Sequence, residues 1–351
     1  MKELLERHTI LDVPDVDLGE VTKPETPDWS SILTAATVTA SELQNLPITP
    51  REAILGKWFR QGDQGFIFAP RGVGKTWLSM LFAHTIATGG KAGPWEASKP
   101  RRVLYVDGEM ALDLTQIRYR ALSPTASENL MFLHHEVVFE RTGKVLNLTS
   151  PIVQESLLRH AIENKIEVLI LDNLSCLFSG VKENDADAWE LILPWLLQLR
   201  RHRIAVVFVA HAGRNGFMRG TSRREDAAVW ILSLSEPVEA STNTAGARFV
   251  ARFTKCRNTP SEDAPALEWQ FQREGIDGVS VKWTVADPLM IFRGWIEEGL
   301  NTCSDLAAEM QVSKGQISKL ARRAQSAGWL TTKGRRYVLM TPDQSRQPHS
   351  D

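Results

Sequence analysis

The chain has 351 residues, of which 43% are hydrophobic and 24% are charged, a composition typical of a globular protein with two or three folding units. Its formal net charge is −1, which excludes an overall attraction to nucleic acid or membranes, so any such binding must come from local basic patches. The three cysteines are widely spaced and form no metal-binding pattern, which favours reduced thiols.

The amino-terminal region gives weak structural signals. Residues 1–40 mix acidic side chains with prolines and show little periodicity, which predicts a mostly disordered leader. The same residues could instead dock on a neighbouring subunit, and the sequence does not decide between the two. A short helical turn is predicted at 41–43 and a helix at 51–59. The charged opening residues and the short apolar runs predict a cytoplasmic protein with no membrane partner.

A phosphate-binding loop is predicted at residues 69–76, between the apolar run 66–68 and a helical pattern that begins at Trp77. Gly72 and Gly74 allow positive φ angles and a close approach of the backbone to a ligand. The successive N–H groups then lie at the start of a helix, where the helix dipole also favours an anion. This order of strand, glycine-rich turn, Gly-Lys-Thr and helix predicts a site for a nucleoside triphosphate.

Within this loop, Lys75 is expected to reach the β- and γ-phosphates of ATP, and the Thr76 hydroxyl is expected to ligate Mg²⁺. Ala69 stands where the usual pattern has glycine, which demands a β-compatible φ angle but blocks nothing obvious. The residues expected to line the nucleotide site are Ala69, Pro70, Arg71, Gly72, Val73, Gly74, Lys75, Thr76 and Trp77.

Downstream of the loop, apolar strands alternate with helices. Near-continuous apolar runs at 102–107, 168–172 and 204–210 are typical of strands buried on both faces of a parallel sheet. Helical patterns lie between them, so the chain is expected to form a doubly wound α/β domain. Four later segments look like strands without intervening helices and predict an antiparallel extension of the sheet, namely 229–234, 248–254, 267–273 and 279–284.

Three of the predicted parallel strands end at polar side chains, and open α/β sheets bind ligands at those ends. Asp172 fits a carboxylate that organises Mg²⁺, and Glu109 fits the base that activates the attacking water. His211 fits a group that senses the γ-phosphate. Each has a simpler alternative: a turn residue for Asp172, a solvated loop carboxylate for Glu109 and a hydrogen-bonded strand end for His211.

Four segments resemble a known family. Residues 106–113 are similar to the segment that contains the catalytic glutamate of RecA-type ATPases, and 168–174 resembles their second Walker motif. Residues 254–260 resemble the Lys-x-Arg-Asn segment of ring helicases of the DnaB type. Together with residues 219–222, this order of motifs is most similar to the RepA-like hexameric ATPases of plasmids and phages. The resemblance spans roughly residues 40–285 and implies a RecA-like P-loop NTPase core with an antiparallel extension.

The resemblance also implies a homo-hexameric ring with ATP and Mg²⁺ bound between subunits. Lys255 and Arg257 would then reach the nucleotide of the adjacent subunit and stabilise charge on the γ-phosphoryl oxygens. Alternate residues of a strand point to one face, so both cations can serve one site. Two exposed strand cations are the alternative interpretation.

A glycine-rich basic segment, residues 212–224, follows the strand that ends at His211. By resemblance it corresponds to the central-channel loop of RecA-like rings, where guanidinium groups track a single strand of DNA. A solvated surface loop, or a role for Arg219 at the nucleotide, is the alternative. The residues expected to contact DNA here are Arg214, Arg219, Arg223 and Arg224.

Residues 287–340 are predicted to form a separate winged helix-turn-helix domain. Helices are expected at 289–298 and 304–310, followed by a third that is capped by Ser313 and by a hairpin at 329–339. The polar face of the third helix is expected to contact duplex DNA, although winged helices also dock on proteins. Its candidate contacts are Gln316, Lys319, Arg322 and Arg323.

The sequence thus predicts four regions: a leader at 1–40, a RecA-like ATPase domain at 41–286, a winged helix domain at 287–340 and a disordered tail at 341–351. Together they predict an ATP-hydrolysing ring motor acting on DNA, a replicative helicase of a plasmid, phage or mobile element. The alternative is a DNA-binding, ATP-dependent regulator or assembly switch that does not unwind. A RecA-type recombinase fits less well, because the Lys-x-Arg-Asn segment favours rings over filaments.

Overall fold

The computed structural model describes residues 27–123, 125–178, 189–212, 222–236, 246–275, 278–310 and 312–340. The chain divides into two compact units, residues 1–50 and 51–351. The predictions for residues 1–26 and 341–351 lie outside the described residues. None of the described helices has the length and apolar character that crossing a bilayer requires.

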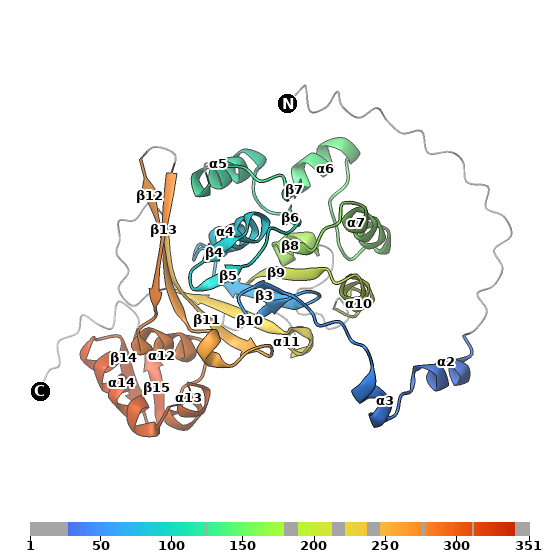
Figure 1. Ribbon diagram of the computed structural model, residues 1–351. Helices are drawn as coiled ribbons and strands as arrows, with labels where there is room; N and C mark the ends of the chain where they lie inside the picture. Colours follow the sequence, from blue (N-terminus) through green and yellow to red (C-terminus); the bar gives the residue numbers. More distant parts are fainter. Residues whose placement is uncertain are drawn as a thin grey trace, which may run out of the picture. The chain divides into compact units, whose positions relative to one another are not determined.

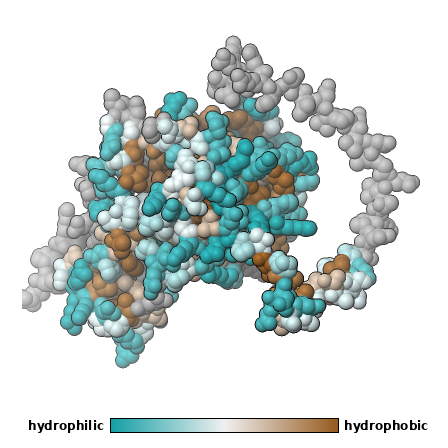
Figure 2. All heavy atoms as spheres, viewed as in Figure 1, coloured by the Kyte–Doolittle hydropathy of each residue, from teal (hydrophilic) through white to brown (hydrophobic). Residues whose placement is uncertain are grey.

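Two short helices, α2 (Trp29–Ala36) and α3 (Ala40–Asn45), occupy part of the predicted leader in the first unit. A side-chain cap starts each helix, from Asp28 in α2 and from Thr39 in α3. The described residues of this unit, 27–50, are all exposed. Figure 2 shows apolar residues on the surface of both helices. Local capping therefore starts these helices, and no side chain of theirs is buried.

A nine-stranded sheet forms the framework of the second unit (Figure 1). Its strand order is β13-β12-β11-β10-β3-β9-β8-β6-β7, and the six strands from β10 to β7 are parallel. The expected mixed α/β fold with a mostly parallel sheet is confirmed. The strands are β3 (Gln64–Ala69), β6 (Val103–Asp107), β7 (Leu130–His134), β8 (Val168–Asp172), β9 (Ala205–His211), β10 (Trp230–Ser235), β11 (Gly246–Cys256), β12 (Leu267–Glu274) and β13 (Gly278–Val285).

Helices cover both faces of this sheet because its strands alternate their buried side chains between two cores. Ile67 of β3 packs with α4 on one face, whereas Phe66 and Phe68 pack with α7 and α10 on the other. The helices of this part are α4 (Lys75–Thr88), α5 (Leu112–Leu122), α6 (His135–Thr142), α7 (Pro151–Glu163), α8 (Leu174–Leu177), α10 (Leu193–Arg201), α11 (Ser222–Ala227) and the 3₁₀ turn η1 (Ser261–Asp263).

The helix predicted at 51–59 is wrong, because this segment forms an antiparallel hairpin of β1 (Ala53–Leu55) and β2 (Phe59–Arg60). Its turn contains Gly56 at a φ of +56°, a left-handed conformation that no right-handed helix contains. A second small hairpin, β4 (Gly90–Ala92) and β5 (Trp95–Ala97), occupies the turn-rich segment after α4.

The antiparallel extension is predicted one strand too early. β10 runs parallel to β3, and the antiparallel pairs are β10–β11, β11–β12 and β12–β13. The reason is α11 (Ser222–Ala227), which lies between β9 and β10 and provides a helix in the crossover connection. This segment is predicted as a glycine-rich loop, which hides the helix of a parallel crossover.

The last described segment forms three helices and a hairpin around a third hydrophobic cluster. These elements match the helices and hairpin expected from the sequence, and Ile317, Leu320, Ala321 and Ala324 of the third helix are buried as predicted. They are α12 (Pro288–Glu297), α13 (Cys303–Glu309), α14 (Lys314–Ser326), β14 (Leu330–Lys333) and β15 (Arg336–Leu339).

A buried ion pair joins this segment to the sheet. Arg252 of β11 contacts Glu298 at 2.5 Å, and its guanidinium lies 3.5 Å from the ring centroid of Trp295. Ser233 of β10 also donates a hydrogen bond to Glu298 at 2.6 Å. Gly294 of α12 is packed so closely that an added Cβ would lie 3.1 Å from Arg252. Helix α12 is therefore held against β10 and β11 by the ion pair and hydrogen bond of Glu298 as well as by side-chain packing.

Candidate functional site

The predicted phosphate loop joins the end of β3 to the start of α4. Gly72 and Gly74 have φ angles of +83° and +127°, so both positive values expected from the sequence are confirmed. At Gly74 a second constraint applies, because an added Cβ would lie 2.5 Å from the ring of Phe249. At Gly72 there is open space, so only the backbone angle requires glycine there.

Lys75, the first residue of α4, is buried although it carries a charge. Its Nζ donates hydrogen bonds to the carbonyl oxygens of Ala69 at 2.9 Å and Pro70 at 2.8 Å. Burial lowers the pKa of Lys75 to about 8, against the opposing effect of Asp172 and Glu109. The ammonium is thus desolvated and held beside the loop by neutral groups, which favours the approach of an anion.

Asp172 ends β8 and is also buried. It accepts a hydrogen bond from the Tyr105 hydroxyl at 2.6 Å, and the nearby Thr76 hydroxyl acts to lower its pKa. Burial raises the pKa of Asp172 to about 6, and the nearby carboxylates of Asp107 and Glu109 act in the same direction. The two residues predicted to bind Mg²⁺, Thr76 and Asp172, are therefore placed near each other.

These two side chains fit a magnesium ion that also binds a nucleotide. A hydroxyl and a carboxylate are hard oxygen donors, and Mg²⁺ usually takes its other ligands from water and phosphates. Among the residues that the structure describes, no group of three or more His, Cys, Asp or Glu side chains could hold a metal ion by itself.

Asp107, at the end of β6, fixes the turn that contains Glu109. One of its oxygens accepts hydrogen bonds from the backbone N–H groups of Glu109, at 3.1 Å, and Met110, at 3.0 Å. The other accepts from the Thr115 hydroxyl of α5 at 2.7 Å. The buried Asp107 carboxylate therefore ties the turn to the following helix and determines where the Glu109 side chain begins.

Glu109, Asn173 and His211 meet at the ends of three neighbouring strands. The Asn173 amide donates to the Glu109 carboxylate and lies 3.0 Å from His211 Nε2, which itself is 3.6 Å from Glu109 Oε2. Asn173 and His211 are buried, whereas the Glu109 side chain is 47% exposed. Glu109 is thus positioned by buried groups and still reaches solvent, as the activation of a water molecule requires.

Comparison with known proteins agrees with this geometry. The model of a family described as AAA domain matches residues 30–216. The chain belongs to the AAA domain family. It is therefore a P-loop ATPase with a RecA-like α/β core. No curated protein matches the chain.

Among solved structures, the flagellar accessory protein FlaH from Methanocaldococcus jannaschii is similar to this AAA domain protein. The two share 12% identity over 63% of this chain and 90% of FlaH, with a TM-score of 0.43. This likeness is too distant to bear on function.

Lys255 and Arg257 are not part of the site formed by their own chain. Lys255 of β11 pairs with Ile231 of β10, and Ile231 pairs with Phe66 of β3. Phe66 lies three residues before Ala69, where β3 ends and the phosphate loop begins. At the usual rise of a strand this separates Lys255 from the level of the phosphate loop by roughly 10 Å. Arg257 follows the end of β11 and lies further away still.

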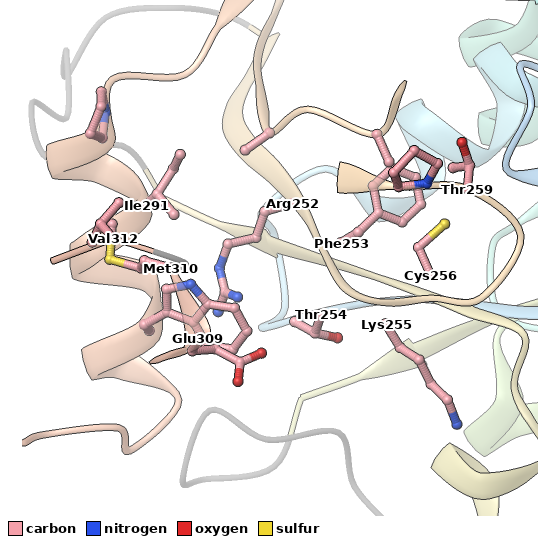
Figure 3. A pocket seen from close by; sticks show the side chains of 15 residues that line it. Arg252, Phe253, Thr254, Lys255, Cys256, Thr259, Ile291, Glu309, Met310 and Val312 are labelled. Carbon is pink, nitrogen blue, oxygen red and sulfur yellow. The ribbon is translucent and has the colours of Figure 1, made fainter. Parts of the chain in front are cut away.

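Figure 3 shows where the Lys255 side chain extends. Its Nζ donates a hydrogen bond to the backbone carbonyl of Glu225 in α11. Together with Arg252 and Glu309, Lys255 lines a cavity of about 590 Å³ beside the carboxyl-terminal helices. Arg257 is exposed. Within its own chain, Lys255 is thus directed to α11, whereas Arg257 faces solvent.

The residues predicted to contact DNA fall into two groups. Arg214 and Arg219 lie outside the described residues, and the structure describes only the helical backbone of Arg223 and Arg224, in α11. The candidates of α14 are all exposed on that helix, namely Gln316, Lys319, Arg322 and Arg323. Of these, Arg323 forms an ion pair with Asp287 at 3.3 Å.

Sequence reasoning missed three residues of the site: Tyr105, Asp107 and Asn173. A signal was present for Tyr105, because it is the one polar side chain inside the apolar run that precedes Asp107. Asp107 ends β6 two residues before Glu109, and Asn173 directly follows Asp172. The contacts of Tyr105 and Asn173 depend on the pairing of β6 with β8, which places Asp107 opposite Asp172. The contacts of Asp107, in contrast, are local.

We expect Glu109→Gln to retain ATP binding and to lower the rate of hydrolysis by about 10²–10⁴-fold, since it removes only the base. Lys75→Ala should instead abolish binding, because it removes the desolvated cation. Glu136→Gln, at a nearby exposed carboxylate that accepts a hydrogen bond from Leu112, is the control and should hydrolyse ATP normally. Nucleotide titration and steady-state ATPase assays measure both quantities. Normal turnover by Glu109→Gln would exclude Glu109 as the base.

Because the pKa of Asp172 is raised in the folded protein, the free energy of unfolding should depend on pH. The folded state binds this proton more tightly than the unfolded state, whose ordinary value is 3.8, so stability falls as the pH rises from about 4 to 6. Asp172→Asn should therefore raise the free energy of unfolding by about 2–3 kcal/mol at pH 8, and by little near pH 4.

Urea unfolding without nucleotide at several pH values measures this effect. Asp113→Asn, at an exposed carboxylate in the first turn of α5, is the control and should change stability by less than about 1 kcal/mol at every pH. A loss of stability in Asp172→Asn at pH 8 would contradict the burial of an ionisable carboxyl at this position.

Proposed function

We propose that this AAA domain ATPase is a ring motor that acts on DNA, of the kind that serves as a replicative helicase in plasmids, phages and other mobile elements. The observation that supports this most is the presence of an exposed basic helix, α14, in the same chain as the phosphate loop. ATP hydrolysis would then be coupled to a bound DNA strand.

At the nucleotide, the proposed roles follow the geometry. Lys75 would contact the β- and γ-phosphates, and Thr76 with Asp172 would hold Mg²⁺. Glu109, positioned by Asp107 and Asn173, would take the proton of the attacking water. His211 lies within 3.6 Å of Glu109 and would respond to the γ-phosphate through it.

A DNA-binding role for the carboxyl-terminal helices rests on how α14 is built. Its apolar side is buried in the third hydrophobic cluster, and its other side is exposed. The basic and polar residues of that side are suited to a phosphate backbone or base edges. The β14–β15 hairpin adds further cations, Lys333, Arg335 and Arg336. We infer a winged helix-turn-helix in which α14 is the recognition helix.

The ring is supported by the distance of Lys255 and Arg257 from their own phosphate loop. In a closed ring a neighbouring subunit can supply such cations to a shared site. A guanidinium that stabilises charge on the γ-phosphoryl group typically adds about 10³–10⁵-fold in rate. We propose a hexamer in which hydrolysis depends on assembly.

One observation favours a second function. The exposed face of α14 is of the type that reads duplex DNA. An ATP-dependent regulator that binds duplex DNA without unwinding it would use α14 alone.

The shared site predicts that two inactive variants restore each other. Glu109→Gln and Arg257→Ala should each be inactive alone, but a mixed ring contains interfaces with both wild-type residues, so ATPase activity should reappear on mixing. Arg159→Ala, at an exposed arginine of α7, should be active alone. If mixing restores nothing while each variant still assembles, Arg257 does not act on a neighbour's nucleotide.

Strand displacement on a forked duplex separates the motor from the regulator. The motor should release the labelled strand with ATP and fail to do so as Glu109→Gln. Replacing Lys319 by Ala should reduce the salt dependence of DNA binding by about one counterion, whereas Arg159→Ala should not. ATP-dependent binding to duplex DNA without strand release would establish the regulator instead.

A further inference from the structure

Three buried polar groups form a continuous chain from the helix of the phosphate loop to the end of β8. The Ser79 hydroxyl of α4 lies 2.8 Å from the Tyr105 hydroxyl, which donates to Asp172 Oδ2 at 2.6 Å. Ser79 and Tyr105 have no exposed surface, and Asp172 is 4% exposed. Burying polar groups so fully costs free energy unless each one is hydrogen-bonded. A functional role is therefore expected for these three connected groups.

The position of Tyr105 follows from strand register. Tyr105 pairs with Ile170 across β6 and β8, and its side chain lies on the same face as Asp172, two residues further along β8. That face is covered by α4, where Ser79 stands one turn after Lys75. The phenol therefore connects α4, β6 and β8 beside the phosphate loop.

The direction of the hydrogen bonds is set by the carboxylate. An ionised Asp172 only accepts, so the single proton of the Tyr105 hydroxyl points to it. The phenol oxygen can then accept the single hydroxyl proton of Ser79, whose alternative acceptor is the carbonyl oxygen of Thr76 at 3.1 Å. Thr76 lies near the same carboxylate. The hydrogen bond that holds Asp172 therefore comes from Tyr105 of the neighbouring strand β6.

We propose that Tyr105 is a positioning residue for the magnesium–nucleotide complex: its hydroxyl fixes the orientation in which the Asp172 carboxylate meets the metal. This inference rests on the proposed role of Asp172 as the magnesium carboxylate. Its aromatic ring has a separate role, packing 5.4 Å from the ring of Phe132. Tyr105→Phe keeps that ring and removes only the hydroxyl.

The test measures magnesium separately from nucleotide. Binding of a fluorescent, non-hydrolysable ATP analogue is titrated with Mg²⁺ and, in parallel, in EDTA. Tyr105→Phe should bind the analogue normally in EDTA but require roughly 10–100-fold more Mg²⁺ for the metal-dependent gain in affinity, the usual loss when a partner of a metal ligand is removed. Circular dichroism confirms that each variant is folded.

Tyr119→Phe is the matched control. Tyr119 also packs on Phe132, at 5.2 Å, and its hydroxyl lies 3.3 Å from His84 instead of a carboxylate. This variant should need no more Mg²⁺ than the wild type. Asp172→Asn is the reference for complete loss of the magnesium carboxylate.

Three outcomes would contradict the account at different points. If Asp172→Asn leaves the magnesium requirement unchanged, the proposed role of Asp172 is wrong. If Asp172→Asn raises it but Tyr105→Phe behaves like Tyr119→Phe, only the role of Tyr105 is wrong. If Tyr105→Phe weakens binding equally with Mg²⁺ and in EDTA, the hydroxyl supports the fold of the site and does not position the carboxylate.

Discussion

The site depends on the burial of charged groups at one edge of a parallel sheet. Asp107, Asp172 and Lys75 are all withdrawn from water, and each is held by hydrogen bonds that the fold supplies. Lys75 donates its hydrogen bonds to neutral carbonyl oxygens, and the pKa of Asp172 is raised. The buried charges of Lys75 and Asp172 destabilise the fold, and active sites commonly lower stability in this way. Binding of a magnesium-bound triphosphate would compensate the charges of both residues.

Strand β11 connects the separate parts of the second unit. Near its start, Phe249 packs against the phosphate loop at Gly74. Further along, Arg252 forms the buried ion pair with Glu298 that fastens the carboxyl-terminal helices. At its end stands Lys255, away from the loop. The nucleotide, the helices proposed to bind DNA and the cation proposed to serve a neighbour thus share one strand, and a shift of β11 would affect all three.

Much of the fold and part of the site could be predicted from the sequence, because they depend on local signals. The glycine angles of the loop, the buried face of α14 and the strand ends at Asp172 and His211 are of this kind. Tyr105 and Asn173 were missed because their partners come from other strands, and only the register brings them together. The hairpin at β1 and β2 was missed because the left-handed Gly56 outweighs the helical pattern around it.

A crystal structure with Mg²⁺ and a non-hydrolysable ATP analogue tests this account most directly. The account predicts that Lys75 leaves the carbonyl oxygens of Ala69 and Pro70 to contact the phosphates, with the metal held next to Thr76 and Asp172. It would be contradicted by a nucleotide bound at the loop while the metal lies away from Asp172, or while Lys75 stays on the two carbonyls.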